Sequence, residues 1–185
     1  MWRTDVPEAA TAPARTWQIR EINAASNAEV TLVAQRMRQT LIEVEGEQVG
    51  TALYTMDWLI ERVRWHLDPA QCKARIFLAE NGDGFIVGHT IVRIEHDDAG
   101  KPFGLISTTY VEPTSRRLGI ATDLLAQGEA WMRAQQLTES ATWTSSTNKK
   151  LIKLYEGYGY AITERGDNDL TGTPMVRLSK RLSPG

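Results

Sequence analysis

The sequence of 185 residues contains a single cysteine, Cys72. One thiol cannot form a disulfide within the chain, which suits a reducing compartment. Basic residues are not in excess either, because 21 Lys and Arg stand against 23 Asp and Glu and give a formal net charge of −2. Nucleic-acid-binding domains normally carry a strong positive excess, so this balance argues against a nucleic-acid partner.

Long apolar runs are also missing. The longest ones fall far short of the ~20 residues that span a bilayer. The N-terminus lacks the basic-then-apolar profile of a secretory signal. The three histidines show no metal-ligand spacing. Together these absences predict a cytoplasmic protein with no membrane partner and no metal.

The length predicts one domain that is large enough to bury a core. Residues 1–15 are rich in Ala, Pro and Thr and show no periodicity, which predicts a flexible N-terminal tail. Residues 16–183 are then expected to form a single domain.

Hydrophobic periodicity divides this domain into strands and helices. Ser26 and Glu29 have the spacing of a capping box, and Gly46 predicts the end of the helix that follows. Residues 47–55 are weakly patterned. The resulting order of elements predicts an α/β (mixed α+β) fold with helices on the faces of one sheet. The predicted strands are 17–22, 74–79, 85–94, 105–111, 141–144, 160–163 and 174–179, and the further predicted helices are 56–67, 120–132 and 148–158.

The stretch from Gly104 to Trp131 predicts an anion site. A strand over residues 105–111 is stopped by Pro113, and a helix begins after Gly119. The first turn of a helix offers unpaired N–H groups, and Arg116 and Arg117 would add positive charge. The simpler alternative is an ordinary turn, since a lone glycine at a helix start is weak evidence by itself.

Two motifs resemble the GNAT superfamily of acyl-CoA-dependent N-acyltransferases. Residues 116–121, RRLGIA, resemble its Arg/Gln-x-x-Gly-x-Gly/Ala signature and follow a strand that ends in Val-x-Pro. Residues 148–160 resemble its second motif, with Asn148, Tyr155 and the pair Gly159-Tyr160 in register. The likeness extends over roughly residues 17 to 180. It implies the GNAT fold, in which a mixed, mostly antiparallel sheet of about six to seven strands has helices on both faces and a splayed strand pair that holds CoA.

The resemblance implies that acetyl-CoA is the acetyl donor and an amine the acceptor, with no metal. The pyrophosphate would lie on the N–H groups of residues 117–122, and the pantetheine amides would bind the free strand edge at residues 109–111. An ordinary core strand and a simple helix cap at Asn148 are the alternatives. The implied cofactor-binding residues are Thr109, Tyr110, Val111, Arg116, Arg117, Leu118, Gly119, Ile120, Ala121, Thr122 and Asn148.

Tyr155 is the implied catalytic residue. In the family the matching tyrosine can protonate the leaving thiolate of CoA. Its helical neighbours Leu151 and Tyr158 place it on an apolar stripe, where an aromatic residue is usually part of the core. Both interpretations stay open at this stage.

No general base is evident. Trp143 stands where some members of the family have a glutamate, and residues 105–111 contain no carboxylate. The amine would lose its proton through water, or to Glu95 or His66. The acidic segment Glu43, Glu45 and Glu47 could attract a cationic acceptor by long-range charge.

The leading hypothesis is therefore an N-acetyltransferase that acts on a primary amine of a small molecule or peptide. The alternative is a non-catalytic GNAT-fold module that binds acyl-CoA or regulates. Antibiotics, polyamines, amino acids, peptide N-termini and lysine side chains all remain open as acceptors, and a homodimer remains open as the oligomeric state.

Overall fold

One mixed sheet of seven strands organises the protein. The computed structural model describes residues 16–184, so the predicted tail at residues 1–15 lies outside the described residues. The strands lie in the order β1-β2-β3-β4-β5-β7-β6, and each neighbouring pair is antiparallel except β4 and β5. Their bounds are β1 Trp17–Glu21, β2 Ala74–Asn81, β3 Ile86–His96, β4 Pro102–Val111, β5 Glu139–Ser145, β6 Ala161–Asp167 and β7 Pro174–Arg181.

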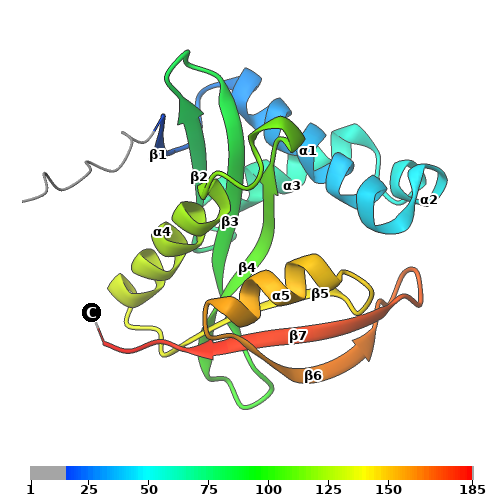
Figure 1. The fold of residues 1–185 in the computed structure, drawn as a ribbon, viewed down its shortest axis with the longest axis vertical. Helices are drawn as coiled ribbons and strands as arrows, with labels where there is room; N and C mark the ends of the chain where they lie inside the picture. Colours follow the sequence, from blue (N-terminus) through cyan, green and yellow to red (C-terminus); the bar gives the residue numbers. More distant parts are fainter. Residues whose placement is uncertain (1–15, 185) are drawn as a thin grey trace, which may run out of the picture.

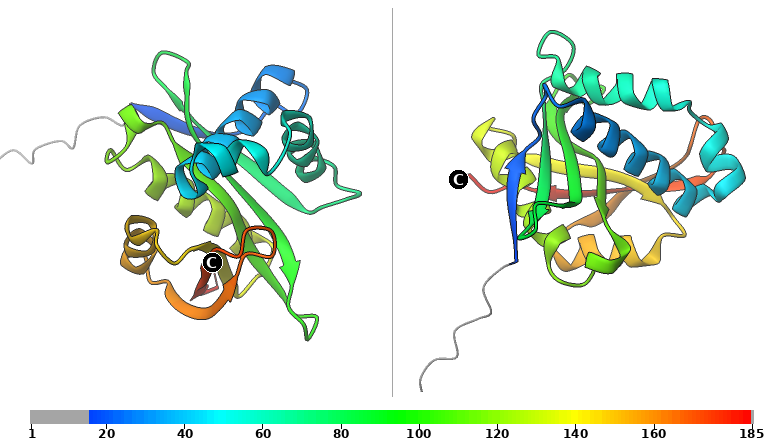
Figure 2. Two further views of the ribbon diagram at one scale, coloured as in Figure 1. Left: turned by 90° about the vertical axis from the view of Figure 1, so that its right-hand side faces the viewer. Right: turned by 90° about the horizontal axis from the view of Figure 1, so that it is seen from above.

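Helices cover both faces of this sheet, as the sequence predicts (Figures 1 and 2). Helices α1 and α3 pack on one face, where they share a hydrophobic cluster with β2 and β3. Helices α4 and α5 pack on the other face over a larger cluster that reaches from β2 to β7. None of the helices in residues 16–184 is long and apolar enough to cross a membrane. The helices are α1 Asn27–Glu45, α2 Glu47–Ala52, α3 Met56–Leu67, α4 Ile120–Ala134 and α5 Lys149–Gly157, with a 3-10 turn at Pro113–Ser115.

Local signals explain where α1 begins and ends. The Ser26 hydroxyl accepts the Glu29 N–H at 3.2 Å, and Gly46 follows the last turn with φ of 86°. Helix α2 is an element that the sequence does not predict. Gly50 lets it lie close to α1, because a Cβ there would come within 2.6 Å of the Ile42 backbone. This packing, rather than any periodicity in residues 47–55, accounts for the short helix.

Strand β4 contains a bulge. Thr108 pairs with Ile91 and Ile106 pairs with Val92, so Ser107 between them has no partner on β3. Because the bulge adds one residue, Ile106 packs with the core under α4 and α5, whereas Thr108 lies on the α1 and α3 side with Ile91.

Beyond the bulge, β4 and β5 separate. Their parallel pairing is limited to Gly104 with Ser140 and Leu105 with Ala141. One residue further along both strands, the Thr142 hydroxyl of β5 donates to the Ile106 carbonyl of β4 at 2.9 Å. Figure 1 shows β4 running at an angle away from β5 and β7. The predicted splayed strand pair is therefore present, and it leaves the second half of β4 with a free edge.

Candidate active site

The Tyr155 side chain lies where β4 and β5 diverge. Helix α5 holds it almost fully buried, at 4 % exposure, with its ring edge-on to that of Tyr160. Its hydroxyl lies near the side chains of Thr109 on β4 and Thr142 on β5, which influence its pKa. Burial raises the pKa of Tyr155, and the two threonine hydroxyls oppose this only in part. Tyr155 is thus both a core residue and a neutral hydroxyl at the gap between the strands.

The free edge of β4 offers backbone groups to this gap. The Glu112 N–H donates to Val87 on β3, and the Thr108 carbonyl accepts from Thr90 on β3. Since backbone groups alternate along a strand, those of Tyr110 also face β3, and those of Thr109 and Val111 face the gap. Of the three predicted pantetheine contacts in this strand, Thr109 therefore has a free backbone and Val111 has a free N–H, because the Val111 carbonyl accepts from Arg116. The Tyr110 ring instead packs on the other face, stacked on His89.

The N-terminus of α4 lies just after this edge. Gly119 precedes the helix with φ of 98°, and no side chain caps the first turn. Within residues 16–184 the N–H groups of that turn therefore have no capping side chain, and they can bind an anion. A Cβ at Gly119 would approach nothing closer than Trp17, at 3.8 Å, so the space above this residue is open. An open, uncapped helix start of this kind is compatible with the anion site that the motif predicts over residues 117–122.

The two arginines of the loop have different surroundings. Arg116 is engaged: its Nε donates to the Val111 carbonyl at 2.8 Å, and its Nη2 pairs with Glu43 at 3.0 Å. Arg117 is exposed, has a left-handed φ of 64°, and makes no hydrogen bond or ion pair to residues 16–184. Arg116 thus fixes the loop against α1, and Arg117 is the arginine that remains available to a phosphate.

The other predicted cofactor residues differ in what their side chains can offer. Ile120 is buried and Ala121 packs against the same core, so each can present only its backbone. Leu118 is exposed, and the Thr122 hydroxyl is hydrogen-bonded to the hydroxyl of Tyr158. Asn148 caps α5 by accepting the Leu151 N–H at 3.3 Å, which is the structural alternative that the sequence left open.

A cavity of about 300 Å³ lies on the opposite face of β4, between the sheet and helices α1 and α3. The cavity reaches the bulge at Ser107 and Thr108. It therefore approaches β4 from one face of the sheet, and Tyr155 approaches the neighbouring gap from the opposite face. Trp143 on β5 closes one flank, at the position where the sequence lacks a glutamate. The remaining lining residues are Met37, Thr40, Leu41, Tyr54, Trp58, Leu59, Arg62, His66, Arg93, Leu105 and Ile106.

His66 lines this cavity but has no nitrogen free to accept a proton. Its Nδ1 lies 2.8 Å from the Arg62 carbonyl, and its Nε2 lies 3.0 Å from Nη1 of Arg93. Because a carbonyl only accepts and a guanidinium only donates, Nδ1 carries the proton and Nε2 accepts. Burial, followed by the two nearby arginines, lowers the pKa of His66 to about 4. His66 is therefore a neutral structural residue rather than a base.

This shifted pKa makes stability depend on pH. The folded value of about 4 lies below the usual ~6.5, so the unfolded chain binds more protons. The contribution of His66 to the free energy of unfolding is complete above about pH 6.5 and is lost as the pH falls toward 4. When the pH is lowered from 7 to 4.5, the free energy of unfolding of the parent protein should fall by about 2 kcal/mol more than that of a His66→Gln variant. Urea unfolding at both pH values measures this, with the exposed His96→Gln as the control that should behave like the parent. An equal pH dependence in all three proteins would contradict it.

The acidic residues proposed to attract the acceptor do not line the cavity. Glu43 is paired with Arg116, and Glu45 accepts a hydrogen bond from the Thr173 hydroxyl at 2.9 Å. Glu47 is exposed in the first turn of α2. Glu95, the other base considered from the sequence, is held by Nε of Arg93 at 2.6 Å. No carboxylate among residues 16–184 lines the cavity.

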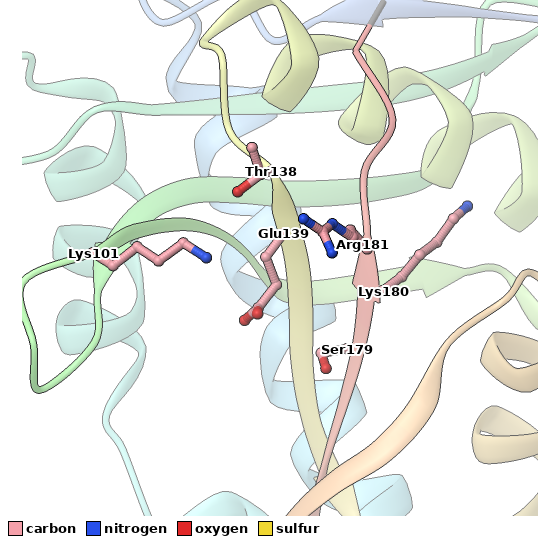
Figure 3. Close-up of a pocket in the computed structure, with 6 residues that line it drawn as sticks. All are labelled: Lys101, Thr138, Glu139, Ser179, Lys180 and Arg181. Carbon is pink, nitrogen blue, oxygen red and sulfur yellow. The ribbon is translucent and has the colours of Figure 1, made fainter.

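A second hollow, of about 320 Å³, lies at the other end of the sheet (Figure 3). It is formed where β4 and β5 begin and β7 ends, far along β4 from the gap. Lys180 extends out of it toward α4, where it pairs with Glu129 at 2.6 Å. Glu139 is likewise paired with Arg177. This polar hollow is separate from the site around Tyr155.

Metal and thiol chemistry receive no support from the described part of the chain. In residues 16–184 no group of three or more His, Cys, Asp or Glu side chains is placed to hold a metal ion. Burial raises the pKa of the Cys72 thiol, so the reactive thiolate is disfavoured.

Several residues of the site could not be found from the sequence. Thr142 and the bulge at Ser107 are ordinary strand residues in the sequence, and only their pairing reveals their position. Tyr54, Trp58 and Arg62 sit on or beside a helix whose periodicity predicts nothing about a cavity.

Comparison with known proteins gives the same fold and family. The profile of the acetyltransferase (GNAT) family matches residues 52–160. An aminoglycoside N(6')-acetyltransferase type 1 from Stenotrophomonas maltophilia is 30% identical over 100 residues, which are 52% of this chain and 65% of that protein. The chain thus matches slightly less than two thirds of the length of this relative.

Two solved structures illustrate the likeness in fold. A chain of the NatC complex bound to Gag peptide and CoA superposes with a TM-score of 0.70 at 16% identity, covering 91% of this chain and 100% of that one. The yncA acetyltransferase of Salmonella typhimurium, solved with its cofactor acetyl-CoA, gives 0.68 at 14% identity, covering 92% and 96%. Since the family profile spans more than half of the sequence, the chain belongs to the acetyltransferase (GNAT) family.

Proposed function

We propose that the protein is an N-acetyltransferase that transfers the acetyl group of acetyl-CoA to a primary amine by direct attack. The observation that carries this proposal is the gap between β4 and β5, with the buried Tyr155 hydroxyl on one side and the cavity beneath Ser107 and Thr108 on the other. A donor bound in the gap and an acceptor bound in the cavity would meet at this point of β4.

The residues around the gap fit CoA. The uncapped first turn of α4 and the free Arg117 suit a pyrophosphate. The backbone of Thr109 and the N–H of Val111 suit the amides of a pantetheine arm, which would add to the sheet edge as a strand does. When bound, acetyl-CoA supplies a thioester whose acyl carbon can be attacked by an amine.

Tyr155 would act on the leaving group. Its raised pKa keeps the hydroxyl protonated at neutral pH, so it has a proton to donate as negative charge develops on sulfur. The hydroxyl lies near Thr109 and Thr142, on the two strands that border the gap. On the acceptor side neither a carboxylate nor a free histidine among residues 16–184 lines the cavity, so water would take the proton of the amine. The rate should accordingly rise from about pH 6 to about pH 9 as the amine loses its proton.

The relatives support an amine acceptor without selecting one. The Stenotrophomonas maltophilia relative is named for acetylation of aminoglycosides, and the NatC structure holds a peptide. Both are amine-bearing molecules of very different size and charge.

The test measures thiol release from acetyl-CoA in the presence of an amine panel, together with the mass of the products. Thiol release that needs both the protein and an amine, with an N-acetylated product, is the expected result. CoA binding by calorimetry without thiol release for any amine would instead favour the alternative of a non-catalytic acyl-CoA-binding module. No CoA binding would overturn both.

A further inference from the structure

The cavity beneath β4 carries positive charge and no negative charge on its walls. Arg62 from α3 and Arg93 from β3 line it, and none of its lining residues is an Asp or Glu. His66 between them is neutral. A multiply charged cationic acceptor would meet no carboxylate of residues 16–184 here, and it would lie beside two arginines.

Arg93 is already neutralised. Its Nε pairs with Glu95 at 2.6 Å, and its Nη1 donates to His66 at 3.0 Å. Its side chain is only 14% exposed, so these two partners fix it in place. The net positive charge of the cavity therefore comes from Arg62.

Arg62 is a cation without an anion. Its guanidinium lies over the ring of Trp65, with 4.0 Å from Cζ to the ring centroid. It donates no hydrogen bond and forms no ion pair to any residue between 16 and 184. Burial, followed by repulsion from Arg93, lowers the pKa of Arg62. A bound anion would supply the partner that residues 16–184 do not.

The remaining walls are flat and aromatic. The rings of Tyr54 and Trp58 stack with centroids 4.0 Å apart and an angle of 13° between their planes. Trp58 is 43% exposed and Trp143 is 40% exposed, although both line the cavity. Exposed aromatic side chains around a cavity suit a planar or apolar body between the two polar ends of a ligand.

We propose that the acceptor is a small amine that also carries a carboxylate, with the carboxylate bound by Arg62 and an apolar or aromatic body between the tryptophans. This inference rests on the proposed function, since it assigns the cavity to the acceptor. The amine end would lie near Ser107 and Thr108, beside the gap between β4 and β5. The carboxylate end would lie at α3.

The experiment compares carboxylate acceptors with their matched amides, and each KM is expressed as the concentration of neutral amine because the α-carboxylate also changes the pKa of a neighbouring α-amine. 4-(Aminomethyl)benzoate and 4-(aminomethyl)benzamide have the same ring and the same amine, and phenylalanine and phenylalaninamide provide a pair with a shorter separation. At least one carboxylate should show a KM about tenfold below that of its matched amide. Arg62→Gln should raise the KM of that carboxylate about tenfold and leave the KM values of the amide and of acetyl-CoA unchanged.

Arg64→Gln is the matched control. It removes the same charge from the same helix, but Arg64 is exposed and donates to Asn27 at 2.6 Å, away from the cavity. This variant should keep the parent preference for the carboxylate. A preference that weakens equally in both variants would mean that only the overall charge matters, and would overturn the assignment to Arg62.

Binding measured without turnover separates this inference from the proposed function. Calorimetry of the same pairs with CoA-loaded protein should show the carboxylate preference even if no thiol is released, in which case the proposed activity fails and carboxylate recognition stands. Thiol release with equal KM values within both pairs, or with spermine or an aminoglycoside as the better acceptor, would leave the activity standing and overturn the carboxylate acceptor. Equal or undetectable binding of all four compounds would overturn it as well.

Discussion

Replacing Tyr155 by phenylalanine is expected to lower kcat for acetyl transfer by about 10²–10⁴-fold, the range typical of a lost general acid. Only the hydroxyl is removed, so the ring keeps its edge-on contact with Tyr160 and its place in the core. The affinity for CoA should change little, because the pyrophosphate and pantetheine contacts come from α4 and β4. Steady-state kinetics and calorimetry on the same preparation measure the two quantities.

Tyr160→Phe provides the control for this prediction. It also removes one buried tyrosine hydroxyl, which is hydrogen-bonded to Ser140 at 2.8 Å on the paired part of β5, away from the gap. Its effect should be confined to stability, about 1 kcal/mol for the lost hydrogen bond. If the two variants turn over like the parent, Tyr155 is a core residue only and the proton for the leaving thiolate comes from elsewhere.

Gly119→Glu should lower the affinity for CoA by more than tenfold, or over ~1.4 kcal/mol. The residue has φ of 98° and stands at the uncapped start of α4, where the space is open. A glutamate there would place a negative charge and a side chain where a pyrophosphate would lie, and it would compete for the same N–H groups. Calorimetric titration with CoA measures the loss.

Left-handed strain is a second effect of this substitution, and it has to be separated from the charge. Gly100 also has a positive φ, 81°, in the turn between β3 and β4, and a Cβ added there would meet nothing within 4 Å. Gly100→Glu therefore carries a similar strain of about 1–2 kcal/mol and the same charge at a remote site. It should bind CoA like the parent. Unchanged CoA binding in a folded Gly119→Glu protein would remove α4 from the anion site.

Local signals in the sequence were sufficient for most elements of the fold. Alternation and turn residues predict the strands, and the Ser26 cap and Gly46 predict the limits of α1, because these interactions lie within a few residues of one another. Helix α2 was missed because it depends on contact with α1 at Gly50, which no periodicity records.

The parts of the site that are local in sequence could likewise be predicted, and the parts that depend on distant contacts could not. The loop before α4 is a continuous segment, so its motif predicts the exposed backbone around Gly119. The engagement of Arg116 by Glu43 joins residues 73 positions apart in the sequence, and it could not be foreseen. The cavity is assembled from α1, α3, β3, β4 and β5, and its charge is visible only once these elements are brought together.

The unpaired Ser107 determines which face of the sheet each later side chain of β4 points to. Every side chain from Thr108 to Val111 lies on its present face because one extra residue precedes it, so removing that residue would exchange the two faces of the sheet along the whole end of the strand. Thr109 would then turn away from Tyr155, and Tyr110 would turn toward α5. The identity of Ser107 is therefore open to change, whereas the number of residues between Leu105 and Pro113 is not. The connections between strands can lengthen or shorten, but the number of residues in β4 must stay the same.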